Sequence, residues 1–165
     1  MSTQGTLIQL TQADLAWPGA LAPETSNAER DARIAALLSS DGPHTYALEG
    51  ALPGVHYLLA GDGTGPLAFL MDVTSGEPVD ISLPLTQAHL LSPSTVAAIA
   101  DAIESMSARA IRVRLESAAL RSCEPFSPRP LEDEDKEWLL AVLQGLMTFM
   151  RRTADDRVAL LVARH

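Results

Sequence analysis

Histidine and carboxylate side chains are the residues of this sequence best suited to acid–base chemistry. His56 lies in an alternating stretch that is predicted to place it on the same face as Glu49 and Asp72. A carboxylate beside an imidazole orients the ring and stabilises its protonated form, so such a pair can transfer protons. A small enzyme that uses His56 with Glu49 or Asp72 is therefore an alternative, although a hydrogen-bonded surface histidine explains the same pattern.

Other motifs that carry chemistry are weaker. The loop 61–65 (GDGTG) is glycine-rich, but a phosphate-binding loop leads into a helix, and here a strand is predicted to follow. Cys123 is the only cysteine, so no internal disulfide can form, and the adjacent Glu124 disfavours a reactive thiolate. No two histidines have the spacing of metal ligands on a helix. The leading interpretation is a protein without cofactor or metal that is not an enzyme.

Charge is distributed unevenly along the chain. The net charge is −9, and residues 34–108 contain eight acidic residues and no lysine or arginine. Nucleic acids and anionic membranes attract cations, so both are disfavoured as partners of this region. A basic protein is favoured, because an acidic surface raises its rate of encounter. Acidic residues scattered for solubility explain the same composition.

Two sets of residues are candidates for contact with such a partner. One set is acidic and lies in predicted strands and loops, and the other lies on a helix predicted over 132–152 that is apolar nearly all round. Such a helix is either central to a core or covered by a partner, which favours a homodimer or a hetero-complex. The candidate partner-binding residues are Asp62, Asp72, Glu77, Asp80, Trp138, Leu146 and Met150.

Hydrophobic periodicity predicts an α+β fold in a single domain over 25–165, after an irregular lead-in over 1–24. Within the lead-in, the apolar run 6–10 is either a strand or a loosely packed arm. We expect an antiparallel β-meander of about four to five strands packed against two to three α-helices. The expected helices are 26–40, a second that opens at Ser92-Pro93, and 132–152. The expected strands are 44–52, 55–60, 66–73, 79–83 and 110–116, with 158–162 as a strand or short helix.

In the order of its elements, its size and its acidity, the chain resembles the bacterial type III secretion chaperones, which are small acidic cytosolic dimers that hold an unfolded effector segment. No residue motif carries this resemblance, and the lead-in and the segment after 153 depart from that pattern. The single cysteine and the lack of a basic residue before Arg30 favour the cytoplasm over secretion. We therefore expect a non-catalytic protein-binding module: a chaperone, an adaptor, or an immunity protein that neutralises a basic toxin. A structural subunit of a larger assembly is a further alternative.

Overall fold

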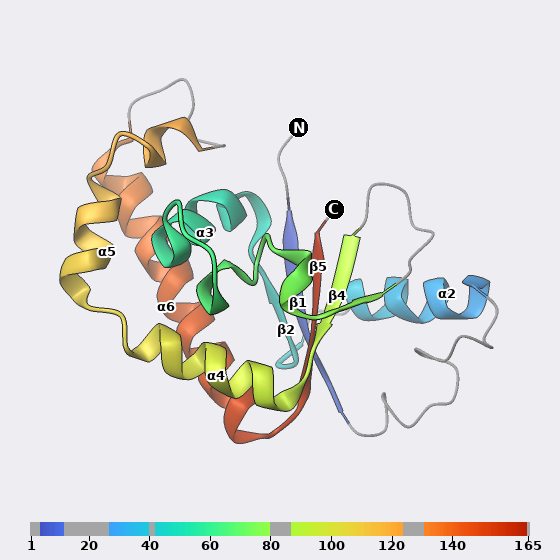
Figure 1. The fold of residues 1–165 in the computed structure, drawn as a ribbon. Coiled ribbons are helices and arrows are strands. Elements are labelled where there is room, and N and C mark those ends of the chain that lie inside the picture. Colours follow the sequence, from blue (N-terminus) through green and yellow to red (C-terminus); the bar gives the residue numbers. More distant parts are fainter. Residues whose placement is uncertain (1–3, 12–26, 40–41, 80–86, 124–130, 165) are drawn as a thin grey trace.

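The computed structural model describes residues 4–11, 27–39, 42–79, 87–123 and 131–164, and its centre is a five-stranded antiparallel sheet (Figure 1). The strand order is β2-β1-β5-β4-β3, and neighbouring strands are antiparallel. The α+β class, the antiparallel sheet and the single domain are therefore confirmed. The strands are β1 (Gly5–Leu10), β2 (Thr45–Ala47), β3 (Glu77–Val79), β4 (Gln87–Leu91) and β5 (Ala159–Arg164).

The two central strands come from opposite ends of the sequence. β1 pairs with β5 along its whole length, from Gly5 opposite Arg164 to Leu10 opposite Ala159. Every residue of β1 is buried, because helices cover both faces of the sheet. Of the alternatives for run 6–10, the strand is confirmed, and it lies at the centre of the sheet although it falls within the predicted lead-in. The run 158–162 is likewise a strand.

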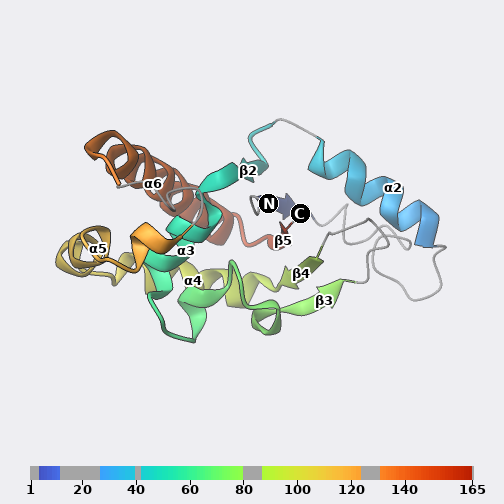
Figure 2. The same cartoon turned by 90° about the horizontal axis from the view of Figure 1, so that it is seen from above.

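Helices cover the sheet unequally on its two sides. Four helices lie on one side and α2 on the other (Figure 2). On the first side Leu91, Leu160 and Val162 pack into the main core, and on the second Ile8 and Leu161 pack with Leu37 and Leu38 of α2. The helices are α2 (Asn27–Leu38), α3 (Leu52–Ala60), α4 (Pro93–Glu104), α5 (Ala108–Leu115) and α6 (Asp133–Asp155), and the short 3-10 helices are η1 (Glu49–Ala51), η2 (Pro66–Ala68), η3 (Val73–Ser75) and η4 (Leu120–Ser122).

Most of the strands predicted between residues 44 and 83 are wrong. Of 44–52 only Thr45–Ala47 is a strand, 55–60 lies in α3, and 66–73 contains η2. The alternation of apolar residues was compatible with a strand, but the same residues bury one side of a helix, and Pro53 suits its first turn. Of the strand expected over 79–83, residue 79 ends β3, and the rest lies outside the described residues.

The strand predicted over 110–116 is also wrong, because these residues form most of α5 and its C-cap. Ser107 caps this helix by accepting a hydrogen bond from the Ala110 amide at 3.1 Å. Arg114 then donates to the carbonyl oxygens of Leu58 and Leu59, at 2.7 and 2.5 Å, which are near the end of α3. The alternation of Arg and apolar residues therefore reflects a short amphipathic helix anchored to α3, not an edge strand.

The other helices agree with the prediction. Ser92 caps α4 by accepting from the Thr95 amide at 3.2 Å, and the apolar side of α4 is buried. A capping box of Glu132 and Asp135 begins α6. The helix predicted over 26–40 is α2 (Asn27–Leu38), and residues 26 and 40 lie outside the described residues. Of the described helices, none has the length and apolarity required to span a membrane.

Candidate functional site

The acidic candidates for partner contact have different surroundings. Asp62, after α3, and Glu77, at the start of β3, are exposed and form no ion pair with a described residue. Asp72 is half-buried and caps η3, where its Oδ1 accepts hydrogen bonds from the Thr74 amide at 2.9 Å and the Thr74 hydroxyl at 2.6 Å. Asp80 lies outside the described residues. Asp62 and Glu77 are therefore available to a partner.

The apolar candidates divide between core and surface. Leu146 and Met150 are fully buried between α6 and the rest of the main core, so their proposed contact with a partner is corrected. The core itself explains most of the apolar character of α6. Trp138 is 39% exposed, as is Leu140, and Val113 on α5 is 64% exposed. Val113 was missed because residues 110–116 were predicted to form a strand rather than a helix.

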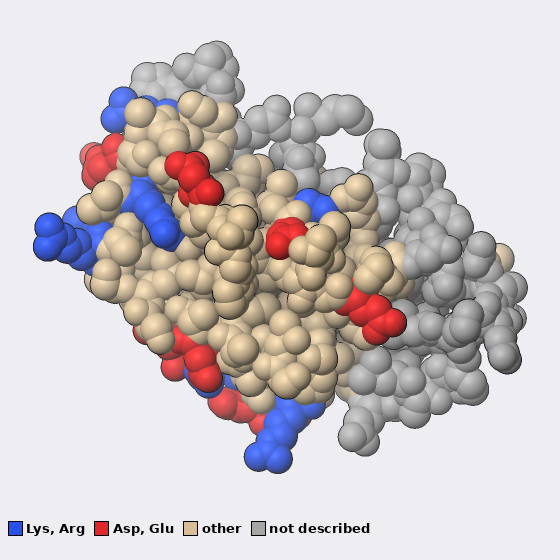
Figure 3. Space-filling model, in the orientation of Figure 1, with Lys and Arg blue, Asp and Glu red and all other residues tan. Residues whose placement is uncertain are grey.

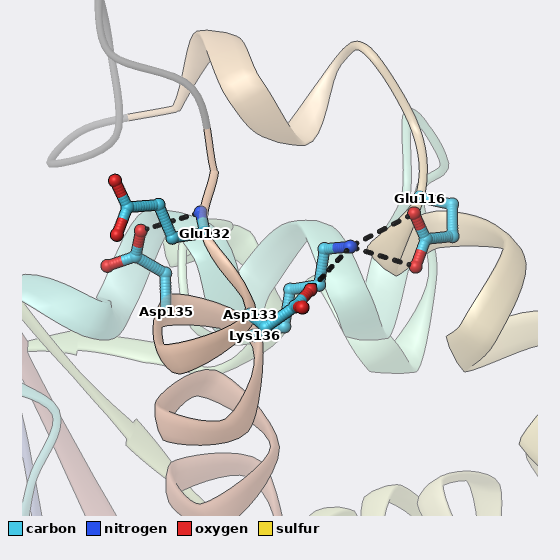
Figure 4. A network of polar contacts seen from close by, with 5 residues as sticks. All are labelled: Glu116, Glu132, Asp133, Asp135 and Lys136. Atoms are coloured by element: carbon cyan, nitrogen blue, oxygen red, sulfur yellow. Dashed lines mark hydrogen bonds and ion pairs between the residues drawn. The ribbon is translucent and has the colours of Figure 1, made fainter.

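Acidic residues near the start of α6 have structural roles instead (Figure 4). Lys136 Nζ contacts Glu116 at 3.1 Å and Asp133 at 3.5 Å, which joins α6 to the end of α5. The Glu132 amide donates to Asp135 at 3.0 Å. Each charge in this network has a partner and reaches solvent, which is the usual arrangement of a stabilising surface contact.

Cys123 is half-buried, and burial raises the pKa of its thiol, with a further increase from the Asp62 carboxylate. A raised pKa leaves less of the nucleophilic thiolate at neutral pH. The environment of this cysteine therefore does not activate it, in agreement with the sequence-based interpretation, although the responsible carboxylate is Asp62.

A second group of polar residues lies between the sheet and the segments that cover it. Gln87 pairs with Arg164 across β4 and β5, and His89 pairs with Val162, so Gln87, His89 and Arg164 share the face covered by α3. Arg164 donates through Nη1 to the Met71 carbonyl at 2.9 Å and through Nη2 to Gln87 Oε1 at 2.6 Å. Together with His56 on α3 and Asp72 before η3, these residues form what we call the His–Arg cluster: His56, Asp72, His89 and Arg164.

The His–Arg cluster contains buried polar atoms that lack hydrogen bonds. They are Nδ1 of His56, both ring nitrogens of His89, and Nε of Arg164, and the polar contact of the His89 ring with the Phe69 backbone does not reach the geometry of a hydrogen bond. In the part of the chain that the structure describes, no other buried side-chain nitrogen or oxygen is without a partner. A buried polar group without a partner costs about 1–3 kcal/mol, so folded proteins nearly always pair such groups with protein, water or a ligand.

Electrostatic effects connect the members of the His–Arg cluster. Burial lowers the pKa of His56, and the positive charge of Arg164 lowers it further. Burial also lowers the pKa of His89. A polar contact of the ring with the Phe69 backbone raises this pKa, the positive charge of Arg164 lowers it, and the Asp72 carboxylate raises it. Hydrogen bonds from Thr74 lower the pKa of Asp72. Both imidazoles are therefore neutral at neutral pH, and each ring has one donor and one acceptor nitrogen.

The pair expected to perform acid–base chemistry is only partly brought together. His56 and Asp72 both belong to the His–Arg cluster, but the Asp72 carboxylate acts on His89 and Arg164. No contact of Glu49 with His56 occurs among the described residues. His89 and Arg164 were missed, although the alternation of Gln87, His89 and Leu91 was a signal that a histidine faces the core. Across the described ranges, no three histidine, cysteine or acidic side chains converge as metal ligands.

These features define an α+β protein with a central antiparallel sheet and a buried polar cluster at one end of it. The chain matches the family model described as "Domain of unknown function (DUF1877)" over residues 1–163, and it belongs to this family. Its fold is similar to that in "The Crystal Structure of a Protein of Unknown Function YfbM from Escherichia coli", with a TM-score of 0.70 and 16% identity over 98% of this chain and 99% of that chain. At this identity the likeness concerns the fold alone. No match is found among curated proteins.

Proposed function

We propose that this chain is a non-catalytic protein-binding module for a basic partner, and that it acts in the bacterial cytoplasm as a chaperone, an adaptor or a toxin-neutralising immunity protein. The observation that supports this proposal is that three of its exposed acidic residues have no ion-pair partner among the described residues. Glu49, Asp62 and Glu77 are exposed, and none of them forms an ion pair with a described residue.

Acidic residues that face α6 are arranged differently. Arg151 binds Asp101 at 3.0 Å and Glu104 at 2.5 Å, so the cation neutralises these two charges. The segment that contains Glu49, Asp62 and Glu77 has no lysine or arginine of its own from residue 34 to residue 108. Its exposed carboxylates therefore contribute a negative potential that attracts a cationic partner, and Arg114 of α5, which lies against Gly61, offsets only the part that comes from Asp62.

The surface around these carboxylates also suits contact with a protein. Figure 3 shows several separate acidic groups on one face of the molecule, with wide uncharged areas between them and basic groups beside some of them. Protein interfaces have a core depleted in charge and a polar rim, so this pattern supports a protein partner. Because the acidic groups are separated, we expect their removal to change the rate of association more than the final affinity.

The partner is either a second copy or a different protein. Three exposed apolar side chains, Val113 on α5 and Trp138 and Leu140 on α6, support association through this end of the molecule. Sedimentation of the purified chain alone distinguishes a homodimer from a monomer that awaits a different partner.

The acidic surface is tested with a triple variant, Glu49→Lys, Asp62→Lys and Glu77→Lys. Immobilised protein is exposed to an extract of the cells in which it is native, and retained proteins are eluted with increasing salt and identified. We expect the wild type to retain a specific basic protein that elutes near physiological ionic strength, where exposed charges are screened over about 8–10 Å, and the triple variant to lose it.

The matched control is the triple variant Glu137→Lys, Asp155→Lys and Asp156→Lys, which changes the net charge equally at exposed positions on and just after α6. The control is expected to retain the same protein as the wild type. Equal losses in both triple variants would show that only the total charge matters, and unchanged retention in both would remove the acidic surface from the proposal.

A second candidate function is a small enzyme that uses His56 with Asp72, and the His–Arg cluster is the observation that favours it. The cluster combines neutral imidazoles with a cation and a carboxylate, which are groups suited to proton transfer. His56→Gln distinguishes the two candidates. It removes an acid–base group that the enzyme would need, whereas a protein-binding module should retain its partner unchanged, because His56 lies outside the acidic surface.

A further inference from the structure

The His–Arg cluster has more hydrogen-bonding capacity than the described protein uses. Its unpartnered atoms come from three elements, with His56 on α3, His89 on β4 and Arg164 on β5. His89 is 0% exposed, so solvent at the surface does not reach its ring. Since isolated buried polar atoms are costly, the occurrence of four of them in these three residues indicates a position that a polar molecule fills.

The available groups favour a ligand that accepts hydrogen bonds. Arg164 offers its Nε–H, and each neutral imidazole offers one N–H, that of His89 in competition with its contact to the Phe69 backbone. Asp72 is the carboxylate of the cluster, and its Oδ1 is already bound by Thr74. No carboxylate of the described residues lies within ion-pair distance of Arg164, whose bonds go to a carbonyl and an amide oxygen. The Arg164 guanidinium, with an unused Nε–H donor next to two neutral imidazoles, therefore favours an anionic ligand.

We infer that the His–Arg cluster binds a small oxyanion of the carboxylate or phosphate class, with Arg164 Nε and the N–H groups of His56 and His89 as donors. Charge-assisted hydrogen bonds from a guanidinium are among the strongest in proteins, and Arg is the preferred residue for both anion classes. This site is separate from the acidic surface that supports the proposed function, and neither depends on the other.

The cluster lies close to the surface, although its unpartnered atoms are themselves buried. His56, Asp72 and Arg164 are only partly buried, and Gln87 beside them is exposed, so His89 forms the inner end of the site. Asp72 also lines an open depression of about 440 Å³ together with Ser75 and Thr95. This depression offers space next to the cluster for the remainder of a larger molecule that carries the oxyanion.

Binding of an oxyanion should be coupled to uptake of a proton. The charged groups that act on the two imidazoles are Arg164 from β5, which disfavours their protonation, and Asp72 before η3, which favours that of His89. A bound anion reverses the effect of Arg164 and raises the pKa of both rings. Oxyanion affinity is therefore expected to increase severalfold from about pH 8 to about pH 6, on either side of the ordinary histidine pKa of about 6.5.

The experiment is a titration of the full chain with inorganic phosphate and, separately, with acetate, followed by the imidazole proton signals in NMR at constant ionic strength. We expect saturable shifts of the His56 and His89 signals and tighter binding at the lower pH. Arg164→Met should weaken binding at least about tenfold, because it removes a charged donor. Arg109→Met, which removes an exposed arginine on α5, is the matched control and should bind as the wild type does.

Each outcome decides the inference. Saturation by phosphate alone identifies a phosphate class, and saturation by acetate identifies a carboxylate class. Absence of saturable shifts with both anions, or equal affinity in the wild type and Arg164→Met, would overturn the inference and leave water as the partner of these atoms. If Arg164→Met does not fold, the wild type still decides, because an unchanged His89 pKa at saturating phosphate contradicts an anion at this position.

Discussion

Two polar groups of this protein show opposite relations between charge and burial. At the start of α6, Lys136, Glu116 and Asp133 lie at the surface, and every charge has a partner (Figure 4). In the His–Arg cluster, His89 is fully buried and neither of its ring nitrogens forms a hydrogen bond of good geometry. The first arrangement stabilises the local structure with little cost, and the second carries a cost that local structure does not explain.

This difference indicates where to look for function. A satisfied surface network such as that of Lys136 accounts for its own residues, because it joins α6 to α5 and supports the helix start. An unsatisfied buried group is instead retained against stability, and such groups gather at functional sites. Comparison of the two groups therefore separates the residues that build the fold from those that a ligand requires.

The largest effect should come from the core beside His89. Leu91 lies on the same face of β4 and is 0% exposed, so Leu91→Ala should lower the free energy of unfolding by about 2–5 kcal/mol. His89→Leu should cost far less, or stabilise, because it replaces an unsatisfied imidazole with an apolar side chain of similar size. Urea denaturation of both variants measures this contrast. Equal losses would mean that His89 has partners essential to the fold.

A smaller effect is expected from pH. Because the pKa values of His56 and His89 are lower in the folded than in the unfolded protein, the unfolded chain binds more protons below about pH 6.5, and stability should fall as the pH decreases from there. Above that pH both rings are neutral in either state, and their contribution is complete.

The variant His89→Leu tests the origin of this pH dependence. It should reduce the slope of unfolding free energy against pH between about pH 6.5 and about pH 5. Equilibrium denaturation at a series of pH values, for the wild type and His89→Leu, gives the slopes. A slope that is identical in the two proteins would assign the acid sensitivity to other groups.

The smallest effect should come from the surface network. The hydrogen bond with Glu116 raises the pKa of Lys136, so this contact persists through neutral pH and is lost only as the pH rises past the lysine range. Lys136→Met should lower the melting temperature by less than Leu91→Ala does, and added salt should diminish the difference from the wild type. A loss as large as that of the core variant, unaffected by salt, would show that the two polar groups are not as different as proposed.

The sequence by itself determined those elements whose ends are marked by local chemistry. Ser92 and Pro93 specify the start of α4, and the acidic residues around Glu132 specify the start of α6, because capping depends only on neighbouring residues. The antiparallel α+β class was also predicted from hydrophobic periodicity, although most of the strands on which that prediction rested are helical in the structure. Asp62 and Glu77 were correctly taken as surface residues, since charged side chains avoid the core.

Tertiary structure alone decided the remainder. The apolar alternation of short segments such as Leu52–Ala60 and Ala108–Leu115 fits either a strand or a helix, and it was their packing, supported by Pro53 and the Ser107 cap, that made them helices. The pairing of β1 with β5 joins residues from opposite ends of the chain, which no local pattern specifies. The His–Arg cluster depends on that pairing, because β5 places Arg164 opposite Gln87 and beside the buried His89 only after the sheet has formed.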